Sequence, residues 1–291
     1  MDAPSARTPA AQPPAPQAQT PRPSSARPTT VADLLSGLRA TAKTLEPTAG
    51  MRLAYASFLQ RRGLIPSDLP YSDFVAVRLL FESTRDAGLW NLQWRITDRE
   101  PRSDAIWRQW QAAAAPSPLR PTATAECDEL SALFAFLVRS LGVHGVGLFW
   151  PYPNHTVAVW QIRPRVRPPI RVVVPTTQIF LAESDLFDTD RFEPWRQRQI
   201  YEYTRSDAAT SLRLPPPLLA FFLAQTRRYG GAGDLSLQRL RYLREAVFQG
   251  RLSASQAAVL ARRAPENGAR DGVAREDAAA FAAFAEAMGA R

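Results

Sequence analysis

The segment from Leu130 to Leu141 constrains the fold most, because it is apolar on nearly every side. Leucine, alanine, phenylalanine and valine fill most of its positions at helical spacing, and Gly142 follows as a terminator. A helix that is apolar almost all round lies inside a domain rather than on its surface. We therefore expect a central buried helix that opens at Cys127, the only cysteine of the chain.

Strands are expected directly after this helix. The segments 145–150, 155–162 and 170–174 are rich in β-branched and aromatic residues, and short segments rich in proline separate them. Three strands joined by short turns favour an antiparallel sheet packed on the helix. The predicted fold class is α+β, with a buried helix that bears Cys127, an antiparallel sheet of three or more strands, and helical extensions at both ends.

Composition divides the chain into four parts. Residues 1–30 are mostly Pro, Ala, Ser, Thr and Gln, so we expect a disordered tail, because such a segment buries too little apolar surface to offset its ordering entropy. Residues 31–121 are interpreted as a helical lead-in and residues 122–210 as the core. Residues 211–291 are interpreted as a C-terminal helical extension.

Caps and apolar periodicity predict the elements of the two flanking parts. In the lead-in we expect a short strand within 89–96 and helices at 31–45, 49–62, 73–87 and after a cap at Ser103 or Asp104. In the core we expect a tight turn at 151–154, between the first and second strands. In the C-terminal part we expect helices at 215–229, 235–248, 253–263 and 278–288.

The charge of the chain is basic but does not indicate a nucleic-acid partner. The formal net charge is +9, yet every basic residue except Lys43 is arginine, which is typical of codon bias across a genome. The arginines are dispersed, and the densest stretch (Arg163, Arg165, Arg167 and Arg171) is best interpreted as a solvated hairpin edge. We expect no nucleic-acid partner, and the oligomeric state is left open.

Hydropathy predicts a chain without a membrane span. No apolar run approaches the roughly 18–20 residues that cross a bilayer. The N-terminus lacks the apolar region of a secretory signal, so the chain as written is expected in the cytoplasm. A location in the cell envelope is the alternative if an export signal has been removed.

The scarcity of cysteine and histidine limits the chemistry. One cysteine excludes an intrachain disulfide, and the two histidines, His144 and His155, match no zinc-binding spacing, so we expect neither metal nor cofactor. A thiol in the first turn of a helix, followed by an imidazole on a nearby strand, is the outline of a cysteine-nucleophile site, because both groups stabilise the thiolate. His144 is interpreted as a loop or strand-end residue.

Two observations oppose that reading. Glu126, Asp128 and Glu129 surround Cys127 in sequence, and their charges disfavour a thiolate. Buried cysteines are usually inert small apolar residues. An unreactive Cys127 therefore stays open as an alternative.

The residues Cys127-Asp128-Glu129-Leu130, with Arg139 and Gly142 further on, resemble the cysteine-bearing helix of the transglutaminase-like superfamily, a papain-like group of folds. The strand 155–162, which begins with His155, is similar to the histidine strand of that family. The resemblance covers about residues 122–178 and implies a catalytic Cys127 and His155. The family's third residue is an Asp before Pro-Thr, and this chain has Val174 there.

Because Val174 cannot orient an imidazole, other residues are candidates for that role. Thr176 or Gln178 are the first candidates, and Thr177 and Asp185 are further ones. The resemblance also implies that an aromatic residue upstream lines the pocket of the thiol. Trp107 and Trp110 are the candidates for such a substrate-binding surface, and the competing interpretation places both tryptophans in the core.

Two functions follow as expectations. The first is a transglutaminase-like cysteine protease, amidase or acyltransferase, in which Cys127 attacks a carboxamide or peptide carbonyl of a protein or peptide substrate and His155 moves the proton. The alternative is a catalytically impaired domain of the same fold that acts as a protein-interaction module. A third, weaker reading is an acyltransferase that would need a cofactor pocket.

Overall fold

The chain combines helices with an antiparallel sheet, and the predicted α+β class is confirmed. The computed structural model describes residues 29–84, 92–95, 102–113, 122–152, 155–174, 176, 207–220, 246–247, 250, 252–253 and 255–257. Statements about absent features below refer to these residues.

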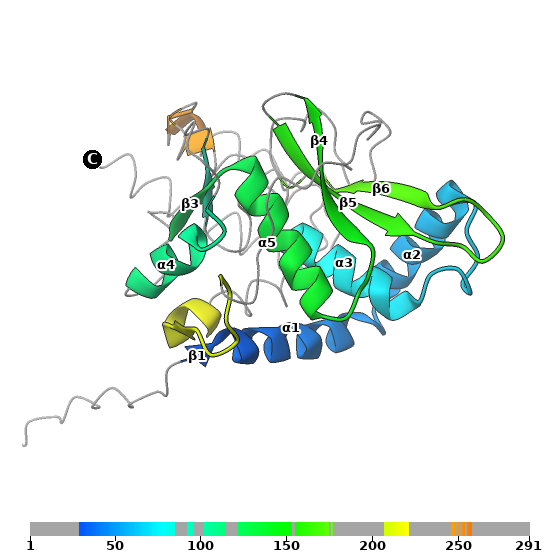
Figure 1. Cartoon of the computed structure of the whole chain (residues 1–291), viewed down its shortest axis with the longest axis horizontal. Coiled ribbons are helices and arrows are strands. Elements are labelled where there is room, and N and C mark those ends of the chain that lie inside the picture. Colours follow the sequence, from blue (N-terminus) through cyan, green and yellow to red (C-terminus); the bar gives the residue numbers. More distant parts are fainter. Residues whose placement is uncertain are drawn as a thin grey trace, which may run out of the picture.

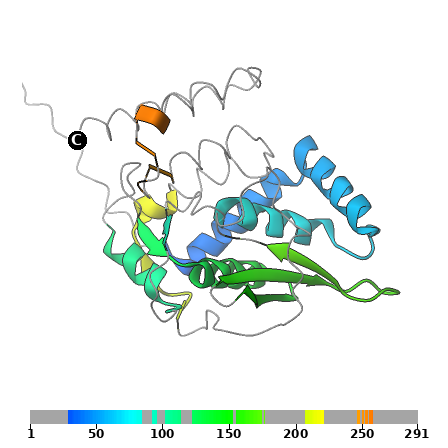
Figure 2. The ribbon, with the colours of Figure 1, turned by 90° about the horizontal axis from the view of Figure 1, so that it is seen from above.

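The centre of the fold is helix α5 (Cys127–Ser140) packed on a three-stranded sheet. The sheet has the order β4-β5-β6, all antiparallel, with β4 at Val146–Tyr152, β5 at His155–Ile162 and β6 at Ile170–Val174. Figures 1 and 2 show this sheet on one side of the helices, with α5 between the sheet and the N-terminal helices. The predicted central helix and its sheet are confirmed.

Three helices lie on the side of α5 that is opposite the sheet. They are α1 (Val31–Leu45), α2 (Ala49–Arg62) and α3 (Tyr71–Thr84). Helix α3 packs on α5, and α1 and α2 pack on α3 (Figure 1). The predicted bounds of α1 and α2 are confirmed: α1 begins after the predicted N-cap Thr30, and α2 ends at the predicted stop Gly63.

Local capping explains these helix ends. The hydroxyl of Thr30 accepts a hydrogen bond from the Asp33 backbone N–H at 3.2 Å, and the Asp33 carboxylate accepts one from the Thr30 backbone N–H at 2.8 Å. This reciprocal pair satisfies two donors at the helix start. At the end of α2, Gly63 takes the left-handed conformation with φ 60°, which costs glycine little.

Helix α3 differs from the amphipathic helix that its sequence predicts. It begins at Tyr71 rather than Asp73, and every residue from Phe74 to Thr84 is buried. The buried positions include Arg78 and Glu82, which form an ion pair at 2.9 Å. The expected extension to residue 87 lies outside the described residues. Contacts with α1, α2 and α5 make α3 a second central helix.

The strands of the sheet bury both faces. On β5, Ala158, Trp160 and Ile162 belong to the main core with α5, whereas Val157 and Val159 belong to a second buried cluster with Phe149 and Val173. This alternation follows from the two-residue period of a strand. The predicted bounds of β5 and β6 are confirmed.

The turn between β4 and β5 is shorter than expected. Pro151 and Tyr152 continue β4, and Tyr152 pairs with His155 after a shift in register that begins at Phe149. A register shift of this kind lets a strand include a proline near its end. Residues 153–154 lie outside the described residues.

Short elements complete the described chain. Strand β1 (Thr29–Thr30) pairs with β7 (Arg213–Leu214), and β2 (Leu92–Trp94) pairs in parallel with β3 (Ala123–Ala125), just before α5. Helix α4 (Ala105–Ala112) follows Asp104, as predicted, although Asp104 makes no side-chain cap bond. Strands β1, β3 and β7 were not predicted, because two or three residues carry no periodicity.

Only parts of the C-terminal helices are described. Residues 216–220 are helical within the predicted 215–229 helix, residues 246–247 within 235–248, and residues 255–257 within 253–263. Ser253 caps the last of these, because its hydroxyl accepts from the Gln256 N–H at 3.2 Å. The remaining residues of these helices, the predicted 278–288 helix and the predicted tail at residues 1–28 lie outside the described residues.

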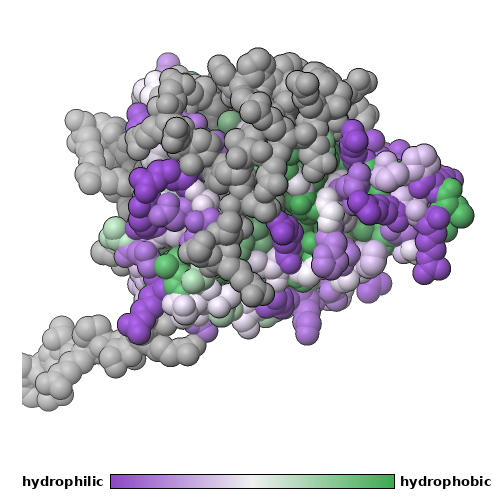
Figure 3. Space-filling model, viewed as in Figure 1, coloured by the Kyte–Doolittle hydropathy of each residue, from purple (hydrophilic) through white to green (hydrophobic). Residues whose placement is uncertain are grey.

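The described surface is mainly hydrophilic on the face that Figure 3 shows. Exposed large apolar side chains are Leu53, Ile65 and Val166, and apolar side chains scattered in this way are normal for a protein surface. The three arginines of the β5–β6 connection and Arg171 in β6 are exposed, as a solvated hairpin edge requires. Among the described helices, none is both long and apolar enough to cross a membrane.

Gly145 is a position where only glycine fits. Its φ is +83°, and a Cβ there would lie 2.5 Å from the carbonyl oxygen of Gln161. Gly145→Ala should therefore destabilise the fold by more than the roughly 1–2 kcal/mol of a left-handed alanine alone. Gly142→Ala is the matched control, because Gly142 has φ +102° and no atom within 4 Å of its Cβ position. Equal urea midpoints for the two variants would show that the close approach of the Gln161 carbonyl to Gly145 does not affect stability.

Candidate active site

The thiol of Cys127 lies where the start of α5 meets the start of β5. Cys127 is the first residue of α5, follows Glu126 as N-cap, and is half-buried. The backbone N–H groups of Thr156 and Asp128 donate hydrogen bonds to its sulfur. Both bonds stabilise the thiolate and therefore lower the pKa of Cys127. Thr156 directly follows His155 in β5, so the structure brings Cys127 beside the backbone of the strand that His155 opens.

A second contact fixes the same junction one helical turn further along α5. The hydroxyl of Ser131 donates to the carbonyl oxygen of Thr156 at 3.2 Å. Residues 127 and 131 lie on the same face of a helix. The N–H of Thr156 therefore faces the Cys127 sulfur, and its carbonyl oxygen faces the Ser131 hydroxyl.

Thr176 joins this network from the segment after β6. It is 1 % exposed, and its Oγ1 lies 2.9 Å from the Ser131 Oγ. A serine hydroxyl has one hydrogen, which Ser131 gives to Thr156, so Thr176 must be the donor in its bond with Ser131. The Thr176 oxygen then keeps acceptor capacity and has no hydrogen left to give.

Burial and charge keep the thiol protonated at neutral pH. The pKa of Cys127 is raised from its ordinary value of 9.0 to about 11, mainly because burial removes water from the thiolate, with further rises from the charges of Asp128 and Glu126. The two backbone hydrogen bonds lower the pKa but are outweighed. The opposition expected from the sequence is confirmed for Asp128 and Glu126 but not for Glu129, and burial is the larger cause.

The neighbouring carboxyls are themselves perturbed. Burial raises the pKa of Asp128 to about 6 and that of Glu129 to about 7, and the nearby Glu126 charge adds to both. The Glu129 carboxylate accepts hydrogen bonds from the backbone N–H of Glu126, at 3.0 Å, and from the backbone of Arg102, and both bonds lower its pKa. Glu129 thus ties the start of α5 to the segment before α4.

These raised pKa values predict how stability depends on pH. A carboxyl whose pKa is higher in the folded state stabilises the fold when protonated, and this contribution is lost as pH rises from about 4 to about 7. Glu129→Gln, which keeps an acceptor for the two N–H bonds, should remove part of that loss. As pH rises from 5 to 8, the free energy of unfolding of the variant should therefore increase by on the order of 2 kcal/mol relative to that of the unaltered protein. Urea titrations at both pH values measure this, and parallel changes in the two proteins would contradict it.

The other candidate site residues are placed as follows. His155 opens β5, and its side chain lies outside the described residues, as do Thr177, Gln178 and Asp185. Val174 is fully buried, and it pairs with Ala158 at the end of β6. Position 174 therefore holds an apolar side chain inside the core.

Trp107 and Trp110 are on the buried face of α4 and belong to the core. Both are 1 % exposed, their rings contact each other at 5.4 Å edge to face, and Trp107 also contacts Phe136 of α5 at 6.0 Å. The interpretation that both belong to the core is confirmed. As placed, neither ring presents a face on which a substrate could lie.

His144 lies at the opposite end of α5 from Cys127. It is exposed in the connection between α5 and β4, as its interpretation as a loop histidine requires. Among the described residues, no group of three or more His, Cys, Asp or Glu could hold a metal ion.

Sequence reasoning missed the residues that build the junction around Cys127. Ser131 carried a signal, because it is a polar residue four positions after Cys127 on an otherwise apolar helix. Thr156 and Arg102 carried none, since they act through their backbone groups. Comparisons with models of known protein families, with curated protein sequences and with solved structures return no match.

Proposed function

We propose that this protein is a thiol-dependent amidase, protease or acyltransferase of the transglutaminase-like type, with Cys127 as nucleophile and His155 as base. One observation carries the proposal. The Cys127 thiol opens a central helix and meets the backbone of β5 at Thr156, the residue next to His155. The order of the helix, the histidine strand and the following strand supports the same reading.

The proposed reaction is acyl transfer. The Cys127 sulfur attacks the carbonyl carbon of a carboxamide or peptide, and the His155 imidazole takes the thiol proton. The imidazolium then gives that proton to the leaving nitrogen as the carbon–nitrogen bond breaks, which leaves a thioester on Cys127. Water, or an amine in the case of transamidation, attacks the thioester and releases the free thiol.

The electrostatics favour a proton transfer that accompanies attack. A thiol with a pKa of about 11 is protonated at neutral pH, so a preformed thiolate–imidazolium pair is not the resting state. The base must therefore accept the proton as the sulfur–carbon bond forms. This arrangement predicts slow turnover compared with thiol enzymes whose thiolate is already present.

Thr176 is the described residue best suited to orient the imidazole. Its hydroxyl hydrogen is committed to Ser131, so its oxygen is left as an acceptor for a ring N–H. An imidazole whose one nitrogen donates to Thr176 would present its other nitrogen as the base. Thr176 would thus be a positioning residue in place of the missing carboxylate.

Peptide-library hydrolysis, with and without an added amine, tests the proposal. Cys127→Ser should abolish cleavage and amine incorporation, and His155→Ala should do so as well. His144→Ala is the matched control and should keep full activity. Thr176→Val should lower kcat and shift its pH profile, and Thr176→Ser should restore both. Activity that persists in Cys127→Ser would reject Cys127 as the nucleophile.

The second candidate is a protein-interaction module that keeps the fold without catalysis. The raised pKa of Cys127 and the buried Val174 favour it. The residues of β5 that join α5 in the main core are even-numbered (Ala158, Trp160, Ile162), so a dyad with residue 155 requires the strand to depart from regular alternation at its first residue. A Cys127→Ser protein that binds the same partners with unchanged affinity, together with an inactive unaltered protein, would favour this candidate.

A further inference from the structure

The connection between β5 and β6, residues 163–169, projects from one end of the molecule. Figures 1 and 2 both show it as the outermost part of the end that it shares with the α2–α3 connection. Its Pro164 is buried, whereas residues 165–169 are exposed, and residues 165–167 form a bend that we call the tip. Prolines with fixed φ stand on both sides of this bend, so the tip loses little backbone freedom when it docks on a partner.

A hydrogen bond holds the tip against the end of α2. The Arg167 guanidinium donates to the carbonyl oxygen of Gly63, the residue at which α2 ends. Ile65 follows Gly63 by two positions, in the α2–α3 connection. The tip and residues 63–65 therefore form one surface.

Two large apolar side chains are exposed on this surface. Val166, at the tip, is 89 % exposed, and Ile65 is 56 % exposed. A single exposed side chain of this kind is ordinary, but these two belong to segments that a hydrogen bond joins. Because the tip projects, a partner can remove both side chains from water without any rearrangement of the fold.

The same surface is strongly basic. The two segments carry five arginines, namely Arg61 and Arg62 in the last turn of α2 and Arg163, Arg165 and Arg167 in the β5–β6 connection. Neither residues 57–67 nor residues 163–170 include an acid. Figure 3 shows this end as mainly hydrophilic, with apolar side chains at its outer edge. Arginines beside projecting apolar side chains match a membrane surface with anionic headgroups.

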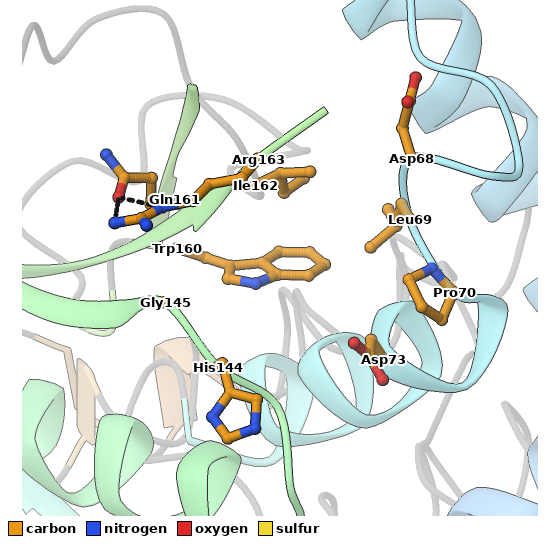
Figure 4. Close-up of a pocket in the computed structure, with 10 residues that line it drawn as sticks. All are labelled: Asp68, Leu69, Pro70, Asp73, His144, Gly145, Trp160, Gln161, Ile162 and Arg163. Carbon is orange, nitrogen blue, oxygen red and sulfur yellow. Dashed lines mark hydrogen bonds between the residues drawn. The ribbon is translucent and has the colours of Figure 1, made fainter. Parts of the chain in front are cut away.

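The two acids of the neighbouring segments do not neutralise these arginines. Asp68 and Asp73 line a cavity of about 400 Å³, together with His144 (Figure 4). The Asp68 carboxylate accepts a hydrogen bond from the Ile65 backbone N–H at 3.2 Å, and Asp73 has a hydrogen bond from Ser72 and lies near His144. Among the described residues, neither carboxylate forms an ion pair with an arginine of the surface. The positive charge is therefore available to an anionic partner.

We propose that this surface docks on an anionic lipid membrane, with Val166 and Ile65 inserted among the headgroups and the arginines paired with lipid phosphates. A nucleic acid would pair with the arginines but would offer Val166 no apolar surroundings. Two apolar side chains and five arginines give a peripheral and reversible attachment. The proposal is independent of the function proposed for Cys127.

Co-sedimentation of the full chain with lipid vesicles tests the docking. The probes are phosphatidylcholine vesicles that contain either about 40 mol% phosphatidylglycerol or no anionic lipid. At about 0.1 M salt we expect at least about tenfold tighter binding to the anionic vesicles, and most of this binding should be lost at about 0.5 M salt because of screening. This comparison uses the unaltered protein. Equal binding to both kinds of vesicle, or no binding to either, would overturn the proposal.

Variants at exposed positions then locate the surface. Val166→Ser and Arg165→Gln should each weaken binding to the anionic vesicles about fivefold. The matched controls are Leu53→Ser, which removes an apolar side chain that is 72 % exposed in the first half of α2, and Arg108→Gln, which removes an exposed arginine of α4. Both controls should stay within about twofold of the unaltered protein. Binding that is unchanged in Val166→Ser would show attachment by charge alone and would overturn the insertion of the tip.

A DNA duplex of about 20 base pairs separates a membrane from a nucleic acid as the partner. At equal phosphate concentration we expect the duplex to bind more weakly than the anionic vesicles, since it gives Val166 no apolar contact. Tighter binding of the duplex than of the vesicles, with no effect of Val166→Ser, would assign the surface to a nucleic acid and overturn the proposal.

Discussion

Iodoacetamide should alkylate Cys127 in the folded protein at pH 7.5 at least ten- to thirtyfold more slowly than in the urea-unfolded chain. A rise of the pKa from 9.0 to about 11 lowers the thiolate fraction at pH 7.5 by a factor of about a hundred relative to a free thiol. The more basic thiolate is a better nucleophile, which recovers part of that factor. Burial of the sulfur slows the reaction further, so the slowing that the raised pKa causes is a lower limit.

Asp128→Asn should speed this alkylation, because the Asp128 charge raises the pKa of Cys127. The Asn side chain can still accept the hydrogen bond that the Asp128 carboxylate takes from the Glu129 N–H, at 2.9 Å. Asp104→Asn removes a carboxylate elsewhere on the surface and is the matched control. The measurement is the rate of mass increase at several pH values. A folded thiol that reacts as fast as the unfolded one would show that neither burial nor charge controls Cys127.

Trp107→Ala should cost about 3–5 kcal/mol of unfolding free energy, the usual range for removing a buried aromatic side chain. Trp107 is 1 % exposed and contacts both Trp110 and Phe136, so its loss leaves a cavity between α4 and α5. Arg108→Ala on the exposed side of α4 is the control. That change breaks only a surface ion pair with Asp104 at 3.0 Å, which is worth at most about 1 kcal/mol.

The same variant separates the two interpretations of the tryptophans. A core residue lowers the urea midpoint when it is removed and affects a reaction only through folding. A substrate surface would leave the midpoint within about 0.5 kcal/mol of the original and raise KM. A stable Trp107→Ala protein with weakened substrate binding would therefore contradict the placement of Trp107 in the core.

Elements with local signals were predictable from the sequence. Thr30 and Gly63 bound α1 and α2, and alternating apolar residues gave β5 and β6 their ends. Helix α3 shows where local signals stop. Its sequence contains Arg78 and Glu82, which suggest an exposed face, but the two charges pair with each other inside the protein. Burial of that face depends on how α1, α2 and α5 pack, which periodicity does not encode.

The candidate site was likewise predictable from the sequence only in part. The position of Cys127 at the start of α5 was predictable from the apolar helix and Gly142. Its contact with Thr156 was not, because a backbone group can belong to any residue type. The cavity lined by Asp68, Asp73 and His144 was also not predictable, since His144 lies far along the chain from the two acids and the spacing matches no motif.

The rate of Cys127 alkylation at pH 7.5 in two histidine variants tests most directly whether Cys127 and His155 form one site. If His155 accepts the proton of the Cys127 thiol, His155→Ala should slow the reaction at least about tenfold below that of the unaltered protein. His144→Ala removes the other histidine, at the far end of α5, and should leave the rate unchanged. A His155→Ala protein that is folded and labelled as fast as the unaltered protein would contradict a shared thiol–imidazole site.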